Sequence, residues 1–438
     1  MSVRRIVAIL LLGLAPFGRA SAQASPASAI TAPPTELTVT LVTFGSGRQV
    51  FERFGHNALW FHDASIGEDV AYHWGLFSFE EPDFLARFLT GETNYWMGAV
   101  DARALIDVER RAGRPTTLQR LNLTPAQATA LRDFVRWNAR DENKFYRYDY
   151  YRDNCSTRLR DAIDRAVGGA LERATGSAPT SLTYRRESVR LTDGDPPVQA
   201  GIDVALGRPA DAPLTVWESF FIPMRLRDAA RDMRIPGPDG AAVPLVASEQ
   251  VLELPATATP IAEASVAPRL AIRFGVLGLA FAALVVILRI MMLSRRSAAW
   301  GLALFGSAWS LLSGVLGVIL LLAWLATKHV FWASNENLLL LTPLSLALVV
   351  LIPASLLRQR GERAARMTAA IVAVLAMVAL LLALSPGGQE NRPVDAMLLP
   401  VHLALAWALA LPRSSLRVTA APHDAPPALG FRSPHQAK

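Results

Sequence analysis

The chain contains one cysteine, Cys155, and its position predicts a reactive thiol. It stands in the segment YRDNCSTRLRD (151–161), where Asp153 and Asn154 are good helix N-cap residues. Apolar residues recur behind it at helical spacing as far as Gly168, so Cys155 is expected in the first turn of a helix. Free backbone N–H groups and the helix dipole favour a thiolate there. The structural alternative is a small buried hydrophobe, the commonest role of a free cysteine.

His56 is the candidate base. It follows Gly55 and precedes an apolar run expected to form a strand, a position that suits a side chain held in a cleft. A thiol and an imidazole from separate elements are the minimum for nucleophilic catalysis by cysteine. His56 would hold Cys155 as an ion pair, and backbone N–H groups at the helix start would stabilise an oxyanion.

Other polar residues stand beside this pair in the sequence. Asn57, Asp153 and Asn154 are the candidates for orienting the imidazole, and the sequence does not choose among them. Arg158 and Asp161 follow the cysteine at a spacing of i, i+3 and are expected to form a structural ion pair next to the site.

Metal and cofactor sites are not expected. A cluster of His56, His62 and His73 is conceivable, but its spacing fits no recognised ligand pattern. One cysteine cannot build a cysteine-rich zinc site. The chain also has no phosphate-binding glycine motif of the GxGxxG or P-loop kind.

Composition divides the 438 residues into one part suited to water and one part suited to a lipid bilayer. Residues 1–22 have the basic start, apolar stretch and A-x-A site of a secretory signal peptide, so residues 23–267 are expected outside the cytoplasm. Residues 268–412 contain apolar segments near the length of a bilayer span, at about 270–293, 298–327, 338–357, 367–385 and 396–412. Basic residues concentrate in the loops that this topology places inside and in residues 413–438, which are expected to be a disordered cytoplasmic tail. Because the net charge of +7 comes from this membrane half, it is no sign of nucleic-acid binding.

The part outside the cytoplasm has the pattern of an α+β domain. Strands are expected at 37–44, 57–61, 71–74 and 100–108, and helices at 82–89, after Thr124-Pro125 and at Cys155. Residues 176–215 are rich in Gly and Pro and are expected to be irregular. The amphipathic stretch 216–233 either lies on the membrane surface or packs on the core.

A strand-borne histidine that precedes a helix-start cysteine resembles the circularly permuted members of the papain-like fold, such as the lecithin:retinol acyltransferase and NlpC-type groups. A more specific resemblance is carried by the segments VTFGSG (42–47), VFERFGHNAL (50–59), HWGLFSF (73–79) and YDYYRDNCSTRLRD (148–161). These are similar to the N-terminal periplasmic domain of the Lnb family of bacterial lipoprotein N-acyltransferases, and residues 268–412 are similar in outline to its membrane helices. His73 departs from the resemblance, since Asn is expected there in many relatives, and it is assigned no essential role.

The resemblance implies a circularly permuted papain-like periplasmic domain followed by about five transmembrane helices, in the bacterial inner membrane. It implies transfer of a fatty acyl chain from a phospholipid, through a Cys155 thioester, to the N-terminal amine of a lipoprotein, with no cofactor. His329, Asn335 and Asn337 are similar to residues of that family's loop before its third membrane helix and are candidate lipid or substrate contacts. The structural alternative is that Asn335 or Asn337 caps the helix that begins near Leu338.

Two other functions fit the same residues. A membrane-tethered papain-like cysteine amidase or peptidase acting on cell-wall peptides would use the same thiol and imidazole, although one anchor helix would suffice for it. A lipid- or peptide-binding sensor would have lost the chemistry, and a Cys155→Ser variant would then be silent.

Overall fold

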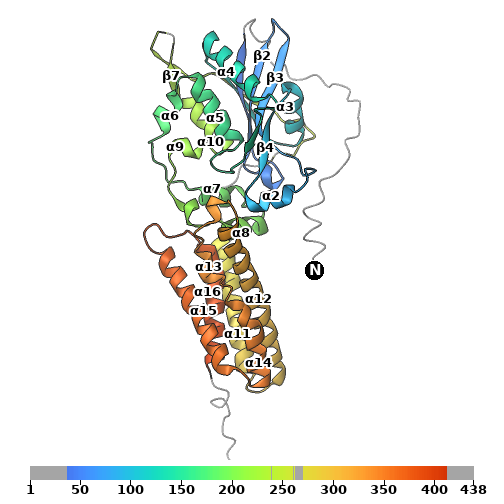
Figure 1. Ribbon diagram of the computed structural model, residues 1–438, viewed down its shortest axis with the longest axis vertical. Helices are drawn as coiled ribbons and strands as arrows, with labels where there is room; N and C mark the ends of the chain where they lie inside the picture. The colour runs from blue at the N-terminus through green and yellow to red at the C-terminus, as the bar shows by residue number, and fades with distance from the viewer. Residues whose placement is uncertain (1–36, 238, 260, 262–269, 412–438) are drawn as a thin grey trace, which may run out of the picture.

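A computed structural model describes residues 37–237, 239–259, 261 and 270–411. The expected signal peptide (1–22) and tail (413–438) lie outside the described residues. An N-terminal α+β domain stands on one end of a bundle of long helices (Figure 1). The α+β class and the helical C-terminal region predicted from the sequence are confirmed.

The N-terminal domain is built on an antiparallel seven-stranded sheet in the order β6-β4-β3-β2-β1-β5-β9. Its strands are β1 (Thr38–Phe44), β2 (His56–Asp63), β3 (Glu68–Leu76), β4 (Asn94–Asp101), β5 (Thr116–Leu121), β6 (Phe145–Arg147) and β9 (Val246–Leu252). A separate hairpin joins β7 (Arg234–Pro236) to β8 (Ala242–Pro244). The predicted strands at 37–44, 57–61 and 71–74 are therefore β1, β2 and β3.

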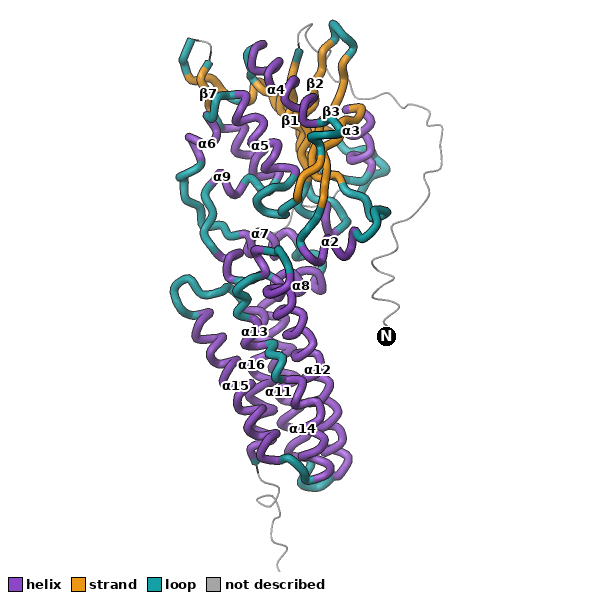
Figure 2. The backbone as a smooth tube through the Cα atoms, in the orientation of Figure 1, coloured by secondary structure: helices purple, strands orange, loops and turns teal. Residues whose placement is uncertain are grey.

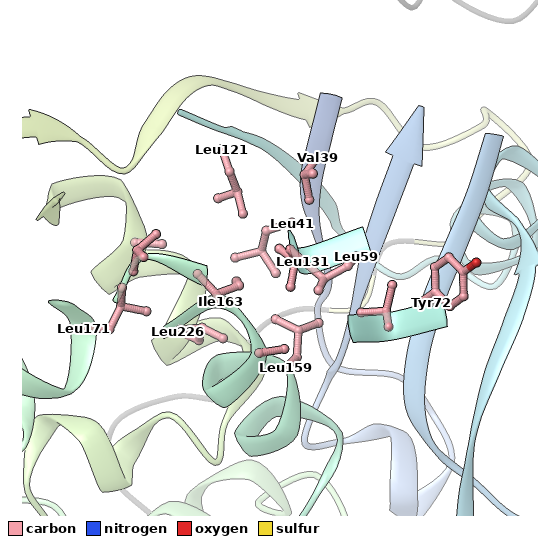
Figure 3. Packing of buried hydrophobic residues seen from close by; sticks show 14 of the residues in the cluster. Val39, Leu41, Leu59, Tyr72, Leu121, Leu131, Leu159, Ile163, Leu171 and Leu226 are labelled. Atoms are coloured by element: carbon pink, nitrogen blue, oxygen red, sulfur yellow. The ribbon is translucent and has the colours of Figure 1, made fainter. Parts of the chain in front are cut away.

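Helices cover both faces of this sheet (Figure 2). On one face α5 (Cys155–Ala166) and α4 (Pro125–Asn138) bury Leu159, Ile163 and Leu131 against Leu41 and Leu59 of the sheet (Figure 3). On the other face lies α3 (Ala102–Arg111). The remaining elements of the domain are η1 (Val50–Glu52), α2 (Phe84–Thr90), α6 (Ala170–Thr175), α7 (Tyr184–Leu191), α8 (Pro196–Ala205), η2 (Arg208–Asp211), α9 (Val216–Ser219) and α10 (Pro223–Asp232).

Three local predictions need correction. The strand expected at 100–108 ends at Asp101 with β4, and residues 102–108 belong to the helix α3, which Asp101 caps by accepting a hydrogen bond from the Ala104 N–H. The stretch 176–215 is not irregular, because it holds α7, α8 and η2. The stretch 216–233 forms α9 and α10, and it packs on the core rather than on the membrane, since Phe220 and Leu226 are fully buried there.

The second part of the chain contains five helices long and apolar enough to cross a bilayer, as far as the described residues extend. They are α11 (Leu270–Met291), α12 (Arg296–Ala326), the pair α13 (Asn337–Leu340) and α14 (Ser345–Arg358), α15 (Glu362–Ala383) and α16 (Arg392–Ala410). Their shared core is made of Leu, Ile, Val and Ala side chains together with Trp309. The connection between α12 and α13 carries the short turn η3 (Val330–Trp332) and faces the N-terminal domain.

Buried hydrogen bonds between α8 and the residues at the start of α13 join the N-terminal domain to the helix bundle, and we call this contact the polar seam. Asn335 Nδ2 donates to the carbonyls of Val204 and Ala205 in α8 at 2.9 and 3.0 Å. Asn337 Nδ2 donates to the same Val204 carbonyl at 3.0 Å. Because an unpaired amide would be costly in so buried a place, these bonds fix α8 on the outer end of the bundle.

Arg185 of α7 anchors the same seam. Its guanidinium donates to Asp203 at 2.9 Å and to Asp211 at 2.7 Å, and all three side chains are buried. We expect an Arg185→Met variant to lose about 3–5 kcal/mol of stability, because two buried carboxylates would lose their partner. Thermal unfolding in detergent measures this, with Arg48→Met at an exposed position as the control. Equal midpoints for the two variants would contradict the assignment.

Candidate functional site

Cys155 is the first residue of α5, as predicted. Asn154 caps this helix: its Oδ1 accepts hydrogen bonds from the N–H groups of Ser156 and Thr157, both at 2.9 Å. Its Nδ2 donates to the carbonyls of Tyr150 and Phe221, at 3.0 and 2.9 Å. Every polar atom of the Asn154 amide is thus committed to holding the helix start in place.

The helix start fits between the ends of β2 and β3. Regular pairing between these strands begins only at Leu59 and Tyr72, which leaves the first residues of β2 without a partner on that side. Gly75 lies in the gap with φ +88°, and a Cβ there would stand 3.2 Å from the Cys155 Cβ. Glycine is needed at this position both for its conformation and for its missing side chain.

Backbone N–H groups favour the ionised form of the half-buried Cys155 sulfur, since hydrogen bonding by those of Asn57 and Ser156 lowers the pKa of the thiol. Burial opposes them more strongly and raises the pKa of Cys155 to about 11. The predicted thiolate is therefore not the resting state, and the residue is a thiol when the site is empty.

The His56 ring is bonded to another histidine. His56 Nε2 lies 2.9 Å from His73 Nδ1, and the rings meet edge to face with centroids 5.1 Å apart. Burial, together with the charges of His73 and Arg114, lowers the pKa of His56 well below its ordinary value. Burial lowers the pKa of His73 to about 4. Both rings are neutral near pH 7, so the expected ion pair of His56 with Cys155 is absent at rest.

His73 occupies the orienting position that was predicted for Asn57, Asp153 or Asn154. Side chains alternate along a strand, so Asn57 turns away from His56, and its Nδ2 donates to Ser156 Oγ at 3.2 Å. Asp153 is held by an arginine and Asn154 by the helix start. The prediction that one of these three orients the imidazole is wrong, because β2–β3 pairing brings His73 to the ring instead.

Lowering the pH should reduce the free energy of unfolding, because His73 takes up a proton more readily in the unfolded chain. Its pKa is about 4 in the folded protein and about 6.5 when unfolded, so the unfolded chain binds the proton more readily. Stability is complete above about pH 6.5 and falls toward pH 4, by on the order of 3 kcal/mol. We expect the thermal unfolding midpoint of His73→Asn to change less between pH 7 and pH 4.5 than that of the wild type. Parallel pH curves for the two proteins would contradict this.

Arg158 pairs with Asp153 and not with Asp161. The guanidinium donates twice to the Asp153 carboxylate, at 2.6 and 2.7 Å, while Asp161 accepts from Arg160. Helical side chains lean toward the helix N-terminus, so Arg158 reaches back over the first turn. Its guanidinium also lies 3.8 Å from the centre of the Tyr146 ring.

Residues that the sequence did not single out complete the site. Burial raises the pKa of the Tyr146 and Tyr148 hydroxyls well above the usual value, and both lie close enough to Cys155 that a thiolate would raise it further. The Tyr146 hydroxyl is buried and has no hydrogen-bond partner of normal geometry among the described residues. The buried cation Arg114 lies 5.9 Å from the Phe44 ring, which stacks on His56. Spacing gave no signal for Arg114, whereas the tyrosines belong to a visible aromatic cluster at 145–151.

His329, Asn335 and Asn337 are not gathered at this site. Asn335 and Asn337 are buried in the seam with their amides bonded to α8, so the prediction that they contact lipid or substrate is wrong. Asn335 Oδ1 instead accepts from the Asn337 N–H at 3.0 Å, close to the capping alternative. His329 Nε2–H donates to the Phe88 carbonyl at 2.9 Å, and the ring stacks on Trp332. Within the described part of the chain, no group of three or more His, Cys, Asp or Glu residues is arranged to hold a metal ion.

Family comparisons agree with this two-part architecture. Residues 26–187 match the model described as the Lnb N-terminal periplasmic domain, and residues 274–410 match the model described as the Lnb transmembrane domain. No curated protein and no solved structure matches the chain. The first match contains the β2–β3 gap, both histidines and the start of α5, and the second spans the five apolar helices. The chain belongs to the Lnb family, as a multi-pass membrane protein with a periplasmic N-terminal domain.

Proposed function

We propose that the protein is a thiol acyltransferase that moves a fatty acyl chain from a phospholipid to the N-terminal amine of a lipoprotein. The observation that carries this proposal is the placement of Cys155 at a helix start, where the N–H groups of Asn57 and Ser156 favour its ionised form. Such groups can stabilise first a thiolate and then the oxyanion of a tetrahedral intermediate. The helical half would keep the site at the outer leaflet of the bacterial inner membrane, where both substrates are anchored.

The first half-reaction forms a thioester. The His56–His73 bond suits a tautomer in which His56 Nε2–H donates to His73 Nδ1, which leaves His56 Nδ1 free to accept a proton. The Cys155 thiol gives its proton to Nδ1 as the sulfur attacks the ester carbonyl of the phospholipid. The C–S bond forms, the ester C–O bond breaks, and His56 returns the proton to the departing lysophospholipid oxygen.

The second half-reaction releases the product. The α-amine of the lipoprotein attacks the thioester carbonyl, and His56 accepts a proton from it. An amide bond forms as the C–S bond breaks, and the sulfur leaves as a thiolate that takes the proton from His56. Because the resting thiol has a pKa of about 11, proton transfer to His56 accompanies the attack and does not precede it.

Lipoprotein mass spectrometry tests the proposal. Cells depleted of their own lipoprotein N-acyltransferase would carry the wild-type chain or Cys155→Ala, with membrane levels of both measured. We expect an added acyl chain on the lipoprotein N-terminus only with the wild type. Lipoproteins that stay diacylated beside folded wild-type protein would overturn the transferase. Hydrolysis of an acyl-enzyme by water, or cleavage of cell-wall peptides, would then support the hydrolase.

Tyr146 offers a further test of the oxyanion arrangement. Its hydroxyl is buried beside Gly75 and close enough to Cys155 for a thiolate to raise its pKa, so we expect it to donate to a developing oxyanion. We expect Tyr146→Phe to slow acyl-enzyme formation about 100-fold, the typical loss for one such donor. Time courses of acyl-enzyme formation measure this, with Tyr184→Phe in α7 as the matched control. Equal rates for the two variants would remove Tyr146 from the mechanism.

A further inference from the structure

The short helix α2 exposes a large apolar face. Leu85 is 60 % exposed, Leu89 52 % and Phe88 40 %, and Phe79 in the preceding turn is 67 % exposed. Apolar side chains clustered on one face of a soluble domain mark a contact surface rather than chance exposure. The described residues of this chain do not cover them.

This face lies beside the end of α12, a helix long and apolar enough to span a membrane. Lys328, two residues beyond the end of the spanning helix α12, donates its N–H to the Thr90 carbonyl at 2.8 Å, and its ammonium pairs with Glu92. The next residue, His329, bonds the Phe88 carbonyl at 2.9 Å. Figure 1 shows α2 directly beside the outer end of the helix bundle. A span fixes the depth of its own end, so these bonds fix the depth of α2 as well.

The face is also continuous with the site. Phe84 of α2 stacks on Phe77, and Phe77 stacks on Tyr95, with ring centroids 5.6 and 5.0 Å apart. Tyr95 stacks on Tyr148 at 4.2 Å. The Tyr148 ring in turn borders the gap at Gly75 that holds Cys155. An unbroken series of rings therefore connects the exposed face to the thiol.

We propose that Phe79, Leu85, Phe88 and Leu89 lie in the outer leaflet of the bilayer, and that a fatty acyl chain passes from this face along the rings to Cys155. Delivery of the acyl chain to Cys155 rests on the acyltransferase function proposed above. A bilayer is the occupant that the geometry favours, since the face continues the end of a spanning helix. Lys328, which is exposed beside it, would stand at the level of the lipid phosphates.

Fluorescence depth measurement tests the membrane contact without any catalysis. In a Cys155→Ala background, Leu89→Cys carries an environment-sensitive fluorophore, and Ile66→Cys is the control. Ile66 is 61 % exposed in the β2–β3 turn, at the far end of those strands from the site. In vesicles of phosphatidylethanolamine and phosphatidylglycerol, we expect a blue shift and quenching by spin-labelled lipid at residue 89 only. Equal spectra and equal quenching at both positions would overturn the contact.

Acylation of Cys155 tests the delivery of the chain. We expect Leu85→Ser/Leu89→Ser to lower the rate of acylation from vesicle phospholipid about tenfold, and to leave acylation by a short-chain water-soluble ester unchanged. The control Ile66→Ser/Val251→Ser removes similar exposed apolar area away from α2 and should match the wild type. Equal vesicle rates for the two double variants would overturn delivery. A wild type that acquires no acyl group from either donor would overturn the proposed function together with delivery, while the fluorescence result still decides the membrane contact.

Discussion

A Cys155→Ala variant is expected to acquire no acyl group from phospholipid, and His56→Ala is expected to acquire one about 100- to 10,000-fold more slowly than the wild type. The two effects differ in kind. Without sulfur no thioester can form, whereas without the imidazole the thiol must lose its proton to water. With a pKa of about 11, only about one thiol in 10,000 is ionised at pH 7, so the base carries most of the activation.

The measurement is the rate at which the purified protein takes up a labelled acyl chain that hydroxylamine releases. His62→Ala is the matched control, because His62 lies on the same strand and on the same side as His56 but away from the gap that holds the cysteine. Raising the pH should partly restore His56→Ala, since hydroxide replaces the missing base, and should leave Cys155→Ala inactive. A His56→Ala protein that acylates at the wild-type rate would show that another group removes the proton.

Variants of His73 distinguish its role in orienting the His56 ring from the role of His56 in proton transfer. His73→Asn keeps a side-chain oxygen that can accept from His56 Nε2–H, whereas His73→Leu leaves that donor without a partner. The Asn variant should therefore retain more activity than the Leu variant, and the pH dependence of kcat/KM should shift only in the latter.

The helix-start cysteine could be predicted because its signals are local. Asn154 caps the helix, and apolar residues at helical spacing follow directly, so Cys155 had to fall in the first turn. The partner of His56 was missed for the opposite reason. His73 reaches it through strand pairing across a turn, and nothing in the spacing of the two residues specifies that register.

The same contrast between local and long-range signals explains why the burial of the polar residues in the seam was not predicted. Asn335 and Asn337 looked like surface residues of an outer loop, and their burial depends on α8, which lies in a stretch predicted to be irregular. Two errors thus had one cause, because prolines in that stretch start helices rather than prevent them. Pro196 and Pro209 both stand in the first turn of their helices, where a missing N–H costs nothing.

Gly75→Ala is expected to lower the rate of acyl-enzyme formation about 3- to 10-fold while leaving the protein folded. The new Cβ would stand 3.2 Å from the Cys155 Cβ, tighter than ordinary van der Waals contact, and both atoms are bonded directly to backbone, so neither can rotate away. The helix start must then shift by a few tenths of an ångström relative to β2. Since a misplacement of about 1 Å at a reacting atom typically costs on the order of 100-fold in rate, this smaller shift should cost about 3- to 10-fold. The positive φ adds about 1–2 kcal/mol of strain.

The control variant Gly67→Ala distinguishes the effect of the steric clash with Cys155 from the effect of backbone strain at a positive φ. Gly67 has φ +68°, comparable to that of Gly75, but a Cβ there would meet no atom within 4 Å. Gly67→Ala should therefore lose about 1–2 kcal/mol of stability through strain alone, Gly75→Ala should lose more, and only Gly75→Ala should lose activity. Thermal unfolding and acyl-enzyme time courses on the two proteins measure both quantities. If Gly75→Ala acylates as fast as Gly67→Ala, the reacting sulfur does not sit in the β2–β3 gap during catalysis, and the N–H groups of Asn57 and Ser156 lose their assigned role.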